Sequence, residues 1–98
     1  MSDYKFKYTA FIGYRFRLQA FEENINLKLT HSDFLGGEVE YIDDYNVFIY
    51  TNLSYNVGQG VSIGGYPLVR RYFQLEEISI TDSPRIEGAK ITKKEVIS

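Results

Sequence analysis

Hydrophobic and polar side chains alternate along several short stretches of the chain, which is the period-2 pattern of half-buried strands. The strongest alternation covers residues 25–30, where apolar Ile25 begins a strict apolar–polar series. A second strand is predicted over residues 34–42, and the glycine pair Gly36-Gly37 interrupts it. Glycines inside a strand pattern indicate a sharp bend or a bulge. Strong bending of this kind is what allows a short sheet to close into a barrel.

Three further strands are predicted, over residues 46–53, 66–75 and 78–80. A tight turn at residues 43–45 precedes the first of them, and a loop with four glycines over residues 54–65 follows it. Two consecutive acidic residues, Glu76 and Glu77, separate the last two strands. The pattern therefore predicts a small all-β domain of five short strands.

The two ends of the chain are less regular than the middle. Apolar residues before residue 25 recur at helical spacing, although a strand phase also fits, and we expect a short N-terminal helix; the helical set is Phe11, Tyr14, Leu18, Phe21 and Ile25. Residues 85–98 form a charged tail with one weak strand pattern near residues 91–97. We expect a single domain over residues 1–98 with its core at about residues 10–81.

The composition is that of a chain that folds, but it points to no particular chemistry. The sequence is 44% hydrophobic, contains 9 Tyr and 7 Phe, and has no Cys, so disulfides and thiol chemistry are excluded. We find neither a signal-peptide pattern nor a long apolar run, and therefore expect a cytoplasmic protein with no membrane segment. The net charge of −2 disfavours broad non-specific binding to nucleic acid.

The residues that most often carry catalysis or metal binding do not form a convincing set. His31 is the only His, and the acidic residues do not follow the spacing of a calcium-binding loop. The glycine-rich segment 58–65 would need a following helix to hold a phosphate, and a strand pattern with Pro67 follows instead. We therefore predict no catalytic residue, no metal site and no cofactor, and do not expect an enzyme.

Two segments carry a resemblance to a known family. Residues 37–47 (GEVEYIDDYNV) contain a glycine, alternating apolar residues, Asp43 and then Asn46, and this order is similar to the first sequence segment of Sm-like proteins. Asn46 lies three positions after Asp43, where the family usually has four. Residues 73–78 (FQLEEI) occupy the place of the second segment, but Gln74 and Leu75 stand where the family has Arg and Gly.

The resemblance implies a strongly bent, open five-stranded barrel that assembles into a ring and binds single-stranded RNA at the pore. The implied RNA-binding residues are Asp43, Tyr45, Asn46 and Gln74. Tyr45 would stack on a base and Asn46 would bond a base edge, which is how proteins commonly hold single-stranded RNA. The alternative is a plain turn, in which Asp and Asn serve the backbone.

In Sm-like rings the fourth strand of one subunit pairs with the fifth strand of the next. Side chains available for that seam are Tyr66, Leu68, Val69, Tyr72, Phe73, Ile78 and Ile80. Alternatively, these side chains pack within their own subunit. The absent Arg and the adjacent acids Asp43 and Asp44, which would repel phosphate, favour a second function, that of a non-catalytic structural or interaction module of a virion or other assembly.

Overall fold

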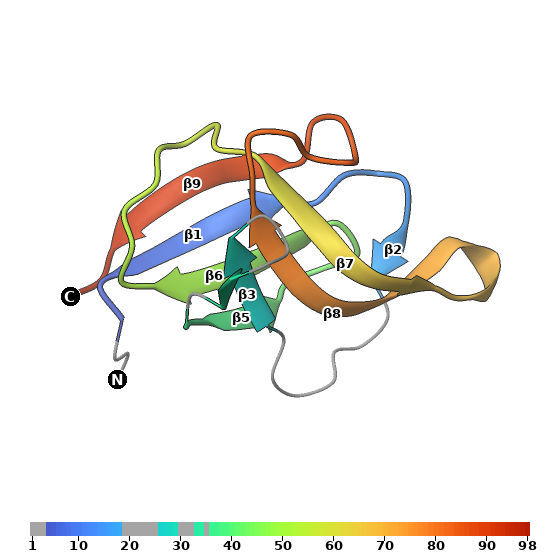
Figure 1. Ribbon diagram of the computed structural model, residues 1–98, viewed down its shortest axis with the longest axis horizontal. Helices are drawn as coiled ribbons and strands as arrows, with labels where there is room; N and C mark the ends of the chain where they lie inside the picture. Colours follow the sequence, from blue (N-terminus) through green and yellow to red (C-terminus); the bar gives the residue numbers. More distant parts are fainter. Residues whose placement is uncertain (1–3, 19–25, 30–32, 35) are drawn as a thin grey trace.

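The computed structural model describes residues 4–18, 26–29, 33–34 and 36–98, which form two β-sheets and almost no helix (Figure 1). The strands are β1 (Phe6–Phe11), β2 (Arg17–Leu18), β3 (Asn26–Leu29), β4 (Asp33–Phe34), β5 (Glu38–Tyr41), β6 (Asn46–Thr51), β7 (Val61–Pro67), β8 (Tyr72–Ile80) and β9 (Lys90–Val96). A single 3-10 turn, η1 (Val69–Arg71), joins β7 to β8. The all-β prediction is confirmed. Within the described ranges, no helix has the length and apolar character needed to cross a bilayer.

The first sheet, sheet A, has the strand order β5-β6-β1-β9, with each neighbouring pair antiparallel. Buried and half-buried residues alternate along its two central strands, as Tyr8 and Ala10 on β1 and Val47 and Ile49 on β6 show. One face of sheet A therefore belongs to the core. The side chains that alternate with these buried ones along β1 and β6 lie on the other face.

The second sheet, sheet B, is organised around β8. Strand β7 runs antiparallel along one edge of β8, while β2 and β3 pair in parallel with successive parts of the other edge. Strand β4 continues the sheet beyond β3. Strand β8 therefore has partners on both edges, along almost its whole length on the β7 side and at residues 72–73 and 77–80 on the other.

The hydrophobic core lies between the two sheets. Its buried residues are Tyr8, Ala10, Ile12, Leu18, Val47, Ile49, Val61, Ile63, Phe73, Leu75, Ile78, Ile80, Ala89 and Ile91. The hydroxyl of Tyr8, whose ring is buried in the core, donates to the carbonyl oxygen of Leu53 at 2.7 Å and accepts from the Tyr55 amide at 2.8 Å. These bonds supply the partners that a buried hydroxyl requires.

The strands predicted over residues 66–75 and 78–80 are wrong in their boundaries. Residues 72–80 form one strand, and Glu76 is an extra residue, because Gly64 pairs with Glu77 while Gly65 pairs with Leu75. This bulge changes the phase of β8 so that residues on both sides of it face the core. A Cβ atom at Gly65, where φ is 150°, would lie 2.0 Å from the Gln74 carbonyl oxygen, so the close approach requires glycine.

The predicted loop over residues 54–65 is therefore wrong at its C-terminal end, which belongs to β7. The predicted turn at residues 43–45 and the predicted bend at Gly36-Gly37 are both present. The glycine pair lies where the chain passes from β4 in sheet B to β5 in sheet A, and Gly36 has φ 73°.

Both ends of the chain differ from expectation. Residues 11–18 hold the end of β1, a bend and β2, so the structure does not confirm the predicted helix there; the rest of its stripe, residues 19–25, lies outside the described residues. Strand β9 pairs with β1 and buries Ile91 completely, so the core extends beyond residue 81 into the segment expected to be a tail. The bent five-stranded barrel is not confirmed, because the described strands form two sheets.

Candidate functional site

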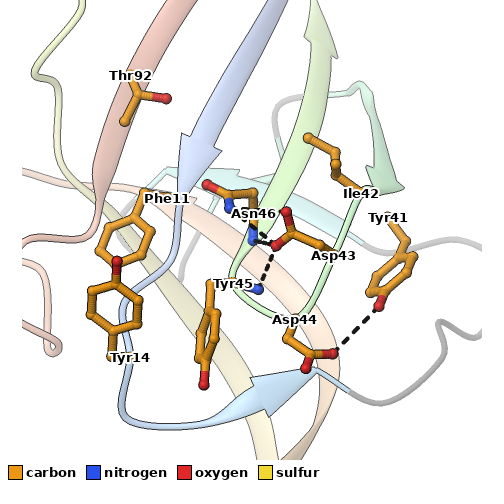
Figure 2. A pocket seen from close by; sticks show the side chains of 9 residues that line it. All are labelled: Phe11, Tyr14, Tyr41, Ile42, Asp43, Asp44, Tyr45, Asn46 and Thr92. Atoms are coloured by element: carbon orange, nitrogen blue, oxygen red, sulfur yellow. Dashed lines mark hydrogen bonds between the residues drawn. The ribbon is translucent and has the colours of Figure 1, made fainter.

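The turn between β5 and β6 holds three of the four residues predicted to bind RNA. The Asp43 carboxylate accepts the backbone amides of Tyr45 at 2.8 Å and Asn46 at 3.0 Å. It also accepts the side-chain amide of Asn46, at 3.0 and 3.2 Å (Figure 2). The hydrogen bonds from the Tyr45 and Asn46 amides lower the pKa of Asp43. Asp43 and Asn46 thus act on each other to fix the turn.

Tyr45 belongs to a chain of three aromatic rings at the end of sheet A. The ring of Phe11 lies 4.6 Å from Tyr14, and Tyr14 lies 5.0 Å from Tyr45, both in edge-to-face geometry. Arg17 on β2 donates from Nε to the Tyr45 hydroxyl at 3.3 Å. The backbone is tied here as well, because the Ile12 amide donates to the Tyr45 carbonyl oxygen at 2.8 Å. These contacts hold the ring of Tyr45 in one position.

An open cleft of about 660 Å³ surrounds the turn. We call it the acid–aromatic cleft; it is lined by Phe11, Tyr14, Tyr41, Ile42, Asp43, Asp44, Tyr45, Asn46 and Thr92. Tyr41 donates to Asp44 at 3.5 Å, and desolvation followed by the charge of Asp44 raises the pKa of Tyr41. Carboxylates beside aromatic faces suit a cationic group. No cluster of three or more His, Asp or Glu side chains able to hold a metal ion occurs in the described part of the chain.

The fourth predicted RNA-binding residue, Gln74, does not line this cleft. It lies on β8, opposite Tyr66 of β7. Its side-chain nitrogen is buried without a hydrogen-bond partner among the described residues. The structure therefore brings Asp43, Tyr45 and Asn46 together and leaves Gln74 out.

The seven residues predicted to form a subunit seam fall into two groups. Phe73, Ile78 and Ile80 are buried in the core of their own chain, at 6%, 0% and 2% exposure. That placement is the alternative that the sequence left open. Tyr66, Leu68 and Val69 are exposed near the tip of the β7–β8 hairpin, and Tyr72, which closes the turn at that tip, is half-buried.

The outer face of sheet A presents aromatic side chains that the sequence analysis did not single out. Along β1 the outward residues are Lys7, Thr9 and Phe11, and along β6 they are Asn46, Phe48 and Tyr50, all half-buried. Pairing places Lys7 opposite Tyr50, Thr9 opposite Phe48 and Phe11 opposite Asn46. Three aromatic rings therefore lie on the two central strands of one sheet face.

Charged side chains border these rings on both sides. Lys7 lies over Phe48, with its Nζ 3.9 Å from the ring centroid. On β9, register places Lys93 opposite Thr9 and Lys90 opposite Phe11, while on β5 Glu40 lies opposite Phe48. The face thus has Lys90, Lys93 and Glu95 along its β9 edge, an acidic edge at β5 and aromatic rings between them.

A signal for this face was present in the sequence. In both β1 and β6, Phe or Tyr stands among the alternate residues that are usually polar in a half-buried strand. Which phase points outward becomes clear only from the pairing of the two strands. The chain matches no protein-family model, no curated protein and no solved structure, so the Sm-like resemblance stays a prediction.

Proposed function

We propose that this protein is a non-catalytic binding module that holds single-stranded nucleic acid, RNA first, on the outer face of sheet A. The observation that carries the proposal is the set of outward aromatic rings Phe11, Phe48 and Tyr50 on two adjacent central strands. Stacking of bases on aromatic side chains is the usual way in which a sheet surface holds single-stranded RNA.

The positions of the rings suit successive bases. Phe48 and Tyr50 are separated by one residue on β6, so both point to the same side, and Phe11 lies diagonally across from Phe48 on β1. Tyr14 and Tyr45 continue from Phe11 into the acid–aromatic cleft, where Asp43 and Asp44 would repel phosphate, so the proposed surface ends at Phe11. The stacking role expected of Tyr45 is therefore assigned to Phe11, Phe48 and Tyr50.

The distribution of charge favours one path for the sugar–phosphate backbone of the bound nucleic acid. Lys90 on β9 is exposed and could contact phosphates, as could Lys93, which also forms an exposed ion pair with Glu95 at 3.6 Å, whereas Glu38 and Glu40 on β5 would repel them. Phosphates would therefore follow β9, with the bases turned inward over β1 and β6. Because basic and acidic groups are both few, binding should be moderate and sensitive to salt.

This function does not depend on ring assembly through β8, which pairs with β7 on one edge and with β2 and β3 on parts of the other. It also does not use Asn46 as a reader of base edges, since the amide of Asn46 donates to Asp43. We therefore expect little sequence preference.

Fluorescence polarisation with a labelled oligo-U, titrated over a salt series, tests the proposal. Removal of one stacking ring in Phe48→Ala should weaken binding by about 5- to 150-fold, because stacking is worth ~1–3 kcal/mol per base. Lys93→Ala should lower the salt dependence as well as the affinity. Oligo-dU of equal length reports whether the ribose matters.

Tyr66→Ala is the matched control, because it removes an exposed aromatic ring from the β7–β8 hairpin and leaves sheet A intact. It should bind oligo-U as the unaltered protein does. Absence of binding at low salt, or equal losses in Phe48→Ala and Tyr66→Ala, would refute the assignment of nucleic-acid binding to sheet A.

A further inference from the structure

The hairpin formed by β7 and β8, which we call the arm, ends in a turn that is the outermost part of the molecule on that side (Figure 1). Apolar side chains cover the tip: Val69 is 80% exposed, Tyr66 51% and Leu68 36%. Arg70 and Arg71 follow directly and are also exposed. Exposed apolar groups gathered at one projecting point indicate a contact surface.

The backbone of the tip is unfavourable for the residues it contains. The Tyr72 amide bonds the Val69 carbonyl, and both intervening arginines have positive φ, 60° for Arg70 and 66° for Arg71. This is the two-residue hairpin turn that Asn-Gly forms most easily. Strain of this kind, kept at an exposed position, points to a function for the two side chains.

The arginines have no acidic partner in their own chain, as far as the described residues go. A complementary surface nevertheless exists on the same molecule. The acid–aromatic cleft offers Asp44 and the faces of Tyr14 and Tyr41, and Tyr14 is 73% exposed. Arginine binds best where a carboxylate and an aromatic face occur together.

We infer that the arm of one molecule docks into the acid–aromatic cleft of a second copy. Arg70 or Arg71 would pair with Asp44 and lie against the exposed ring of Tyr14, while Val69 and Tyr66 cover the apolar part of the cleft. The tip of the arm lies beside the cleft of its own chain, because Tyr72, which closes the tip turn, lies near Arg17 and Tyr41. Two copies can therefore exchange arms about a two-fold axis, with both contacts made at once.

A second copy fits the arm better than a nucleic acid or an anionic membrane. Either of those would meet the arginines but would also face the nearby carboxylates Asp43 and Asp44, which repel phosphate. A second copy instead uses those carboxylates as partners. The pairing of opposite charges also predicts that association weakens as salt increases.

Analytical ultracentrifugation of the full chain over a range of concentrations tests the inference. We expect a mass twice that of the 11.4 kDa chain at high concentration and low salt. Arg70→Asn/Arg71→Gly should weaken association by about tenfold or more, since central arginines of an interface carry much of its affinity. This variant suits the turn better than the natural residues, so failure to fold is not an expected explanation of the loss.

A mixing experiment then identifies the two contacting surfaces. Asp44→Lys alters the cleft but keeps the arm, and the arm variant keeps the cleft. Each should be monomeric alone, and a mixture of the two should regain association, because one intact arm then meets one intact cleft. A monomeric natural protein at every concentration, or a mixture that stays monomeric, would overturn the inference. Loss of oligo-U or anionic-vesicle binding in the arm variant, with association unchanged, would overturn it too.

Discussion

The strained hairpin tip leads to a quantitative prediction about stability. Replacing Arg70 by Asn and Arg71 by Gly should raise the free energy of unfolding, although the substitutions remove no clash and add no contact. A left-handed backbone costs a residue other than glycine about 1–2 kcal/mol, and Asn tolerates it better than Arg. The greater conformational freedom of glycine in the unfolded chain stabilises that state and offsets about 0.5–1 kcal/mol of the gain. We expect a net increase of about 1–2 kcal/mol.

The assay is urea and thermal unfolding at a concentration where the protein is monomeric. A domain of this size should gain about 4–8 °C in Tm for each kcal/mol. The matched control is Arg70→Ala/Arg71→Ala, which removes the same charges but keeps a Cβ at both positions with positive φ. It should show no comparable increase. An unchanged or lower Tm for the Asn-Gly variant would show that the turn is not strained.

Three further predictions concern the core and the β5–β6 turn. Tyr8→Phe should lower the free energy of unfolding by about 1–3 kcal/mol in chemical denaturation, because the Leu53 carbonyl and the Tyr55 amide lose a buried partner. Ile91→Ala should cost about 2–5 kcal/mol, as expected of a fully buried strand residue; a cost near zero would return residues 85–98 to the status of a tail. The lowered pKa of Asp43 means that its carboxylate stabilises the folded state above the unfolded pKa of about 3.9, and that this contribution is lost as pH falls through the folded value. The difference between the urea midpoints at neutral and at acidic pH should therefore be smaller in Asp43→Ala than in the natural protein.

The features predicted well from the sequence are the local ones. Asp43 forms its turn with residues two and three positions further on, so the sequence contains all the partners needed. The strand at residues 46–51 is likewise predicted from its own β-forming residues. Glycine at position 36 gives a bend for reasons of its own backbone freedom.

The features that failed depend on partners far away in the chain. Glu76 and Glu77 suggest a break when considered alone, and only the close approach of Gly65 from β7 turns that site into a bulge within one strand. Ile91 lies in a charged segment, and its burial follows from pairing with β1. The outer face of sheet A was missed for the same reason, because the alternate residues of β1 and β6 form one surface only when the two strands pair.

The antiparallel pairing of β1 with β9 constrains how this protein is made. The Thr92 hydroxyl donates to the Thr9 carbonyl oxygen across 83 positions, and the paired residues of β1 and β9 are separated by similar distances in sequence. At a synthesis rate of about 5–20 residues per second, roughly 4–16 s pass between emergence of β1 from the ribosome and arrival of its last neighbour. During that interval a nascent chain exposes the open edge of an aromatic-rich strand, which is a template for wrong pairing. Shielding that edge until translation is nearly finished would therefore favour productive folding.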